Sequence, residues 1–116
     1  MTRKKETMDI EKQAVLFSVL ADPTRLKLLN LLSQQQEPNA LCVNALAYQL
    51  GVTQSAISQH LRVLKSAGLV KGERRGYRIH YFVSQEGLIQ AQEQISCALP
   101  VKEKAATGNS AGETGK

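Results

Sequence analysis

The chain has little of what several classes of protein depend on. It contains only two cysteines, Cys42 and Cys97, among 116 residues, which is too few for a disulfide framework and suits a reducing compartment. No apolar run approaches the length of a membrane span. The basic N-terminus, MTRKKETMDIEKQ, is not followed by the apolar stretch of a signal peptide. These absences predict a cytoplasmic protein without a membrane segment.

Acidic residues are scarce in the segment from Arg62 to His80, where Glu73 is the only acid. The whole chain has a formal charge of +5 and an apolar content of 42%, which is ordinary for one small globular domain. A local excess of positive charge is the electrostatic footprint expected for a polyanionic partner. The basic residues of this segment are Arg62, Lys65, Lys71, Arg74, Arg75 and Arg78.

One predicted helix, within the sequence GVTQSAISQHLRVLKSAGLV, has no acid on its polar face. With the turn of about 100° per residue that a 3.6-residue period implies, the side chains separate into two arcs. The apolar arc contains Ala56, Ile57, Leu61, Val63, Leu64 and Ala67. The polar arc contains Gln54, Ser55, Ser58, Gln59, Arg62, Lys65 and Ser66. The helix therefore has one face for a core and one for a partner.

The side chains of this polar face are those that hydrogen-bond to base edges and phosphates. An ordinary solvated face, the alternative interpretation, would be rich in Glu and Lys. Thr53 is a suitable N-cap and Gly68 a stop signal. His60 falls at roughly 240° on the wheel, inside the apolar arc. We therefore interpret His60 as a packed or hydrogen-bonded residue and leave it out of the base-reading set.

Short helices precede this one. An apolar-rich segment from Ile10 to Ala21 predicts a helix buried on more than one face. Asp22 and Pro23 mark the start of a second helix that extends to about Ser33, and the polar sequence QQQEPNA predicts a loop. Apolar residues then recur with helical spacing in CVNALAYQLG, which ends at Gly51. Only the link from Gly51 to Thr53 separates this helix from the polar-faced one, which indicates a helix-turn-helix.

The sequence LVKGERRGYRIHYFVS predicts a two-stranded hairpin, with strands at about 69–74 and 77–83 and a tip near Arg75 and Gly76. Arg74, Arg75 and Arg78 surround this tip. Charge at a hairpin tip can serve solubility alone, but three arginines beside an acid-free helix favour contacts with DNA phosphates and the minor groove. Ser84 is a suitable cap for a last helix that extends to about Leu99 and carries an apolar seam. We predict a flexible basic arm at 1–8, a DNA-binding and dimerisation domain at 9–99, and a disordered tail at 100–116.

In combination, the motifs ADPTRLKLLNLL, LGVTQSAISQHLRVLKSAGLV and GYRIHYFVS make the chain resemble the ArsR/SmtB family of winged-helix repressors. The resemblance covers roughly residues 10 to 99. It implies a mostly α-helical winged helix-turn-helix fold, with five helices and a two-stranded wing. It also implies a homodimer joined through the first and last helices. The family's Gln-Ser-x-x-Ser pattern falls on Gln54, Ser55 and Ser58, with Gln59, Arg62 and Lys65 on the same arc.

Many members of this family sense a metal through a Cys-x-Cys pair, but the corresponding segment here is Cys42-Val43-Asn44. The second thiol is missing, and the last helix contains no histidine. A tight metal site needs three or four converging ligands, so we predict neither a metal nor another cofactor. Cys42 lies near a helix N-terminus, which favours thiolate. Cys42 and Cys97 are therefore either packed, inert side chains or the thiols of a redox or sulfur-responsive switch.

We therefore predict a sequence-specific, dimeric DNA-binding repressor that leaves operator DNA when an unidentified effector changes the dimer, with half-sites roughly 34 Å apart. The alternatives are a winged-helix module for protein contacts and a repressor that responds through Cys42 and Cys97. No nucleophile-base pair, phosphate loop or carboxylate dyad is recognisable, so we do not expect an enzyme.

Overall fold

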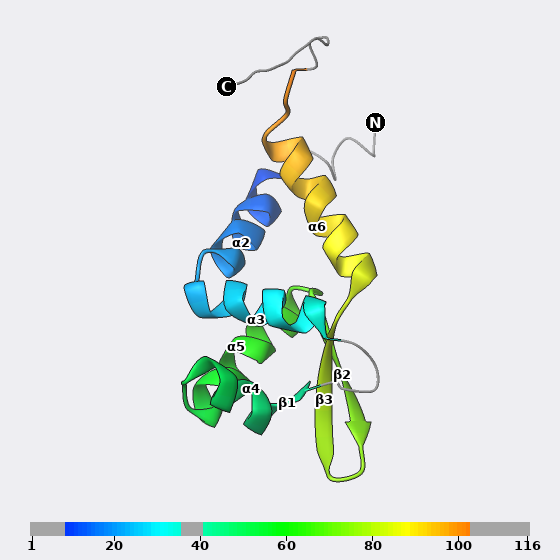
Figure 1. Ribbon diagram of the computed structural model, residues 1–116. Coiled ribbons are helices and arrows are strands. Elements are labelled where there is room, and N and C mark those ends of the chain that lie inside the picture. Colours follow the sequence, from blue (N-terminus) through cyan, green and yellow to red (C-terminus); the bar gives the residue numbers. More distant parts are fainter. Residues whose placement is uncertain (1–8, 36–40, 103–116) are drawn as a thin grey trace, which may run out of the picture.

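The computed structural model describes residues 9–35 and 41–102, which form five helices and a small antiparallel sheet (Figure 1). The basic arm expected at 1–8, part of the predicted loop and most of the tail expected at 100–116 lie outside the described residues. In chain order the elements are α2 (Ile10–Leu20), α3 (Pro23–Gln34), β1 (Leu41–Cys42), α4 (Val43–Leu50), α5 (Gln54–Ser66), β2 (Val70–Arg75), β3 (Arg78–Val83) and α6 (Gln85–Ala98).

Polar side chains cap the helices where the sequence predicts it. Asp22 accepts hydrogen bonds from the backbone N–H groups of Thr24 (2.8 Å) and Arg25 (3.1 Å) at the start of α3. Thr53 caps α5, and Ser84 caps α6 in the same way. These caps satisfy N–H groups that have no partner inside their helices. Each cap therefore determines the residue at which its helix begins.

Helix α4 ends at Gly51, whose φ of 69° places it in the left-handed region. A side chain at this position would strain the backbone, whereas glycine adopts the conformation at little cost. The Gly51 N–H bonds back to the Ala47 carbonyl oxygen at 2.9 Å. Only Val52 and Thr53 separate Gly51 from α5, so α4 and α5 form the predicted helix-turn-helix.

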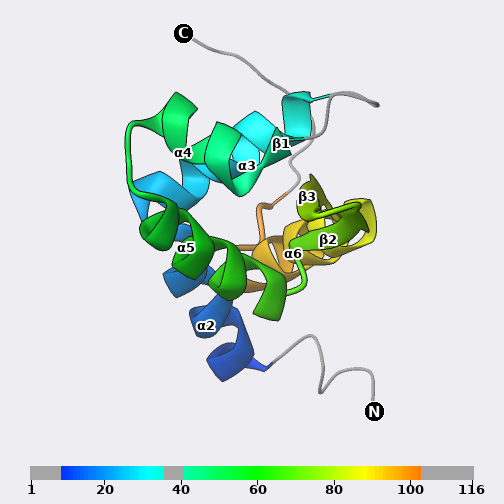
Figure 2. The same ribbon diagram turned by 90° about the horizontal axis from the view of Figure 1, so that it is seen from below.

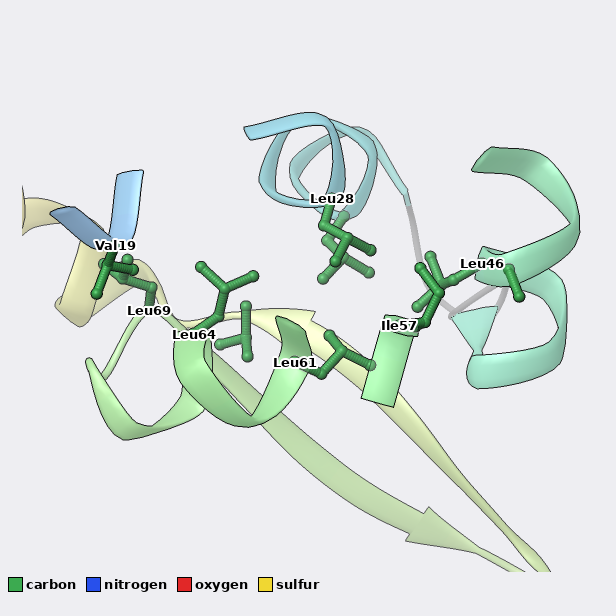
Figure 3. Packing of buried hydrophobic residues seen from close by; sticks show 10 residues of the cluster. Val19, Leu28, Leu46, Ile57, Leu61, Leu64 and Leu69 are labelled. Carbon is green, nitrogen blue, oxygen red and sulfur yellow. The ribbon is translucent and has the colours of Figure 1, made fainter. Parts of the chain in front are cut away.

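The core lies between α3, α4 and α5, and apolar residues of α2 and of the start of β2 close it (Figure 3). Helix α5 contributes Ile57, Leu61 and Leu64, which are all buried. These three residues belong to the apolar arc of the helical wheel, so that part of the prediction is confirmed. The other fully buried large side chains are Leu28, Leu32, Leu46 and Leu69.

The sheet has three strands in the order β1-β3-β2, rather than the two that the sequence predicts. The additional strand, β1, pairs Leu41 with Tyr81 and Cys42 with His80. The side chain of Gln35 joins β1 to β3, since it accepts from the Leu41 N–H at 2.8 Å and donates to the Tyr81 carbonyl. A two-residue strand is too short to show an alternating pattern, which is why sequence periodicity missed it.

Helices α2 and α6 extend away from the core on the side opposite the wing, as Figure 1 shows. Within one chain α2 buries only Gln13 and Val19, and α6 buries no residue. The expectation that α2 is buried on more than one face is therefore wrong for the single chain, because only its inward side meets α3 and α6. The Gln13 side chain donates to the Gln94 side chain at 3.1 Å and joins the two helices. No helix in the described ranges is both long and apolar enough to cross a membrane.

The first turn of α6 packs against the turn that follows α5. A Cβ atom placed on Gly87 would lie 1.8 Å from the carbonyl oxygen of Gly68. No real contact is that short, and the neighbour is backbone rather than a flexible side chain. Gly87 is therefore required for this close approach, which anchors α6 to the end of α5.

We predict that Gly87→Ala destabilises the fold. An exposed helical Gly→Ala change ordinarily stabilises by about 0.5–1 kcal/mol, but here the clash should reverse the sign, with a loss of about 1–3 kcal/mol. Chemical denaturation followed by circular dichroism measures the free energy of unfolding. Ser96→Ala, at an exposed position of the same helix, is the matched control. An unchanged or higher stability of the Gly87 variant would contradict the packing described above.

Candidate nucleic-acid interface

Helix α5 presents the predicted polar face to solvent. All six side chains predicted to contact DNA from this helix are exposed, whereas Ile57, Leu61 and Leu64 on the other side are buried. The first turn contains no acid, and Thr53 accepts from the Ala56 N–H at 3.0 Å. The positive end of the helix dipole therefore lies beside uncharged polar groups. The six exposed residues are Gln54, Ser55, Ser58, Gln59, Arg62 and Lys65.

His60 turns away from this exposed face. Its side chain is half-buried, and its Nδ1 atom lies 3.3 Å from an Nη1 atom of Arg25 in α3. The interpretation of His60 as a hydrogen-bonded residue is confirmed. Nothing in the sequence pattern indicated that Arg25 would be its partner, because the two residues are far apart in the chain.

The wing carries its basic residues on both faces. Cross-strand pairing puts Arg74 opposite Ile79, and Arg75 opposite Arg78. Neighbouring residues of a strand point to opposite faces, so Arg75 and Arg78 share one face while Arg74 lies on the other. Arg74 and Arg78 are exposed. Seen from below, α5 and the wing lie next to each other (Figure 2).

Arg75 differs from the other two arginines because the wing itself binds it. Its Nε and Nη2 atoms lie 3.2 and 2.9 Å from Oε1 of Glu73, and its guanidinium lies 5.1 Å from the centroid of the Phe82 ring. Glu73 therefore already balances part of the charge of Arg75. The exposed cations Arg74 and Arg78 are better placed for a polyanion than Arg75.

Cys42 is the N-cap residue of α4 and is half-buried. The backbone N–H of Ala45 lowers the pKa of the Cys42 thiol below its ordinary value, and the N–H of Asn44 and the charge of Arg78 act in the same direction. Partial burial opposes this effect. The neutral thiol makes no capping hydrogen bond, so the amides act by stabilising the thiolate.

A cavity of about 220 Å³ adjoins Cys42 between α4 and β3. Opposite Cys42 in the sheet is His80, whose Nδ1 atom is buried and has no hydrogen-bond partner. The sequence did not reveal this arrangement, because it depends on strand β1. The residues that line the cavity are Cys42, Val43, Asn44, Arg78, Ile79 and Tyr81.

The structure does not bring the two thiols together. Cys97 is exposed in the last turn of α6, and that end of α6 lies far from β1 in Figure 1. A disulfide needs Cα atoms within about 7 Å, which the two cysteines of one chain cannot provide in this arrangement. In the described part of the chain, no three His, Cys, Asp or Glu side chains converge as metal ligands.

Comparison with known proteins places the chain among bacterial transcriptional regulators of one family. The family model "Bacterial regulatory protein, arsR family" matches residues 22–71. A transcriptional repressor SmtB homolog from Synechocystis is 36% identical over 86 residues, which span 74% of this chain and 62% of that protein. The nodulation protein NolR of Rhizobium meliloti is 35% identical over 88 residues, which span 76% of this chain and 69% of NolR.

A solved structure extends the similarity to the fold. The homodimeric winged helix-turn-helix DNA-binding domain of a possible ArsR-family transcriptional regulator from Mycobacterium bovis superposes with a TM-score of 0.61 at 28% identity. The superposition covers 85% of this chain and 90% of that domain. The sequence matches and the similar fold indicate the same kind of protein, and the exposed polar face of α5 is consistent with it. The chain belongs to the arsR family of bacterial regulatory proteins and is a winged helix-turn-helix transcriptional regulator.

Proposed function

We propose that this protein is a dimeric repressor that binds operator DNA through α5 and the wing of each protomer. An effector would release it by changing the geometry of the dimer. The observation that carries the proposal is the exposed, acid-free face of α5, held in place by a buried opposite face. A helix of this kind fits the major groove, with its N-terminal residues nearest the base edges.

The α5 face and the wing have different parts in this proposal. Gln54, Ser55 and Ser58 near the capped end of α5 would read base edges, with Gln59 beside them. Arg62 and Lys65 lie farther along the same face and would contact phosphates. The exposed wing residues Arg74 and Arg78 would add contacts with phosphates or the minor groove that do not depend on sequence. Arg75 would contribute less, because Glu73 already pairs with it.

The dimer would form through α2 and α6. These helices have large apolar side chains that nothing in the single chain covers, among them Val15, which is 62% exposed, and Ile89, which is 55% exposed. A second copy that buried such a surface would gain hydrophobic stabilisation. The similar domain from Mycobacterium bovis is homodimeric, which supports the same assembly here.

A sensor role for Cys42 is the second candidate, and its lowered pKa beside a cavity favours it. Thiolate is the reactive form of cysteine, so Cys42 would react with oxidants or sulfur species before an ordinary thiol does. Its position where α4 meets the wing would transmit the change to the DNA-binding elements. Cys97 is not needed as an intramolecular partner. The pairing of Cys42 with Cys97 as one switch therefore loses support.

For DNA recognition, we predict that Gln54→Ala or Ser58→Ala relaxes sequence preference by about 1–3 kcal/mol per lost base contact. Arg74→Ala should instead weaken binding to all duplexes equally, and Arg75→Ala should do so less. Fluorescence anisotropy with promoter and random duplexes measures both effects. When it is repeated over a salt series, a plot of the logarithm of the binding constant against the logarithm of the salt concentration should have a slope of about −0.9 per phosphate neutralised. Equal losses on both duplexes from every variant would refute this division of roles. Absence of any sequence preference at low salt would favour the protein-contact module.

For the dimer, we predict that Val15→Glu and Ile89→Glu each produce monomers, because a carboxylate at a buried apolar contact costs more than the contact gains. Light scattering after gel filtration should show the mass of one 12.7 kDa chain instead of two. Tyr48→Glu is the control, since this α4 residue is 88% exposed and lies outside the proposed contact. A wild-type protein that is monomeric at micromolar concentration would refute the proposal.

For the thiol, we predict that Cys42 alkylates at lower pH in the folded protein than in the unfolded chain. Its folded pKa is lowered, so the thiolate persists to more acidic pH. Cys97→Ser leaves Cys42 as the only thiol. The rate of its alkylation by iodoacetamide, measured across pH with and without denaturant, gives the pKa of Cys42 in the folded and in the unfolded chain. Cys42→Ser provides the same comparison for Cys97. A folded Cys42 that titrates no lower than the unfolded one, or modified Cys42 with unchanged operator affinity, would contradict the sensor role.

A further inference from the structure

Arg25, in the first turn of α3, lies where three helices meet. Its backbone N–H is fixed by the Asp22 cap at 3.1 Å. Its guanidinium donates through Nε to the carbonyl oxygen of Val19 at 2.7 Å, and through Nη2 to that of Ser18 at 3.3 Å. Both acceptors are in the last turn of α2, and that turn contains no basic residue. Arg25 therefore adds a cation and two donors at the C-terminal end of α2, where the Ala21 N–H also donates to the Ser18 carbonyl oxygen at 3.3 Å.

The third arm of the same guanidinium reaches the DNA-reading helix. Nη1 lies 3.3 Å from Nδ1 of His60, in the middle of α5. Arginine has only N–H donors, so Arg25 is the donor in a hydrogen bond between these two atoms. The planar guanidinium fixes the directions of its donors relative to one another. A shift of α2 that carried the two carbonyl oxygens with it would therefore turn the group away from His60.

We propose that Arg25 is a positioning residue that sets the orientation of α5 relative to α2, and hence the spacing between the two DNA-reading helices of the dimer. This inference rests on the proposed function, in which α2 belongs to the dimer contact and α5 reads the groove. His60 lies next to Gln59 and two residues from Ser58 on α5. A change in the Arg25–His60 contact would thus rotate or tilt the residues proposed to meet the bases.

If Arg25 has this role, its loss should change how strongly the dimer discriminates between half-site spacings, and not only its affinity for DNA. A dimer with a fixed distance between its recognition helices rejects operators whose half-sites are moved by one base pair. Without the Arg25 bridge the two α5 helices would adjust more easily, so this rejection should weaken. A residue that only stabilised the fold would lower the affinity for both spacings by the same factor.

The test uses the full-length dimer and duplexes derived from a promoter fragment that the wild-type protein selects, with the original spacing and with one base pair inserted. The ratio of the two Kd values should fall by about fivefold or more in Arg25→Gln, a size typical of coupling between sites. Arg25→Lys keeps the positive charge but lacks the planar guanidinium with its several donors, so its Kd ratio should lie between those of Arg25→Gln and the wild type. Lys27→Gln removes a cation from an exposed position of the same helix and should leave the ratio unchanged.

His60→Leu breaks the bridge on the α5 side and leaves the contacts of Arg25 with α2, so it serves even where the Arg25 variants fold poorly. It should lower the ratio in the same direction, and combining it with Arg25→Gln should add little. An unchanged ratio in His60→Leu, or a uniform loss of affinity in Arg25→Gln, overturns the inference while the proposed function stands. If the wild-type protein selects no promoter sequence at all, the proposed function fails and this inference fails with it.

Discussion

The burial of one side of α5 is the constraint on which the rest of the structure depends. Ile57, Leu61 and Leu64 enter the core between α3 and α4, and each buried side chain of this size stabilises the fold by about 1.5–3 kcal/mol. Rotating α5 about its axis would expose these residues and bury charged ones. The core therefore determines which residues face outward, so the exposed polar face of α5 is a consequence of packing on the opposite side.

Much of the fold could be predicted from the sequence, because its signals are local. The helix caps at Asp22, Thr53 and Ser84 depend on neighbouring residues, as does the apolar period of α5. The exposure of the polar arc followed from the same period. Strand positions in the wing were predicted to within one residue, since alternation and a Gly-containing turn define a hairpin without reference to other elements.

Most of the missed features depend on contacts between distant parts of the chain. Strand β1 exists because Leu41 and Cys42 meet β3 and the side chain of Gln35, and two residues show no periodicity of their own. The contact between Arg25 and His60 joins separate helices, and no spacing rule relates them. The apolar character of α2 was visible, but the sequence could not show that Ile10 and Val15 remain exposed in one chain. The pairing of Arg75 with Glu73 was also missed, because a charge count treats every arginine as equally available.

Strand β1 has a mechanical consequence for the wing. Leu69 connects strand β2 of the hairpin to α5. Strand β3 is hydrogen-bonded to β1, and β1 runs directly into α4. The wing thus has two attachments to the helix-turn-helix, one to each of its helices. A hinge motion of the wing alone would have to break the β1–β3 pairing. Because of these two attachments, a displacement of the wing is coupled to α4 and to α5.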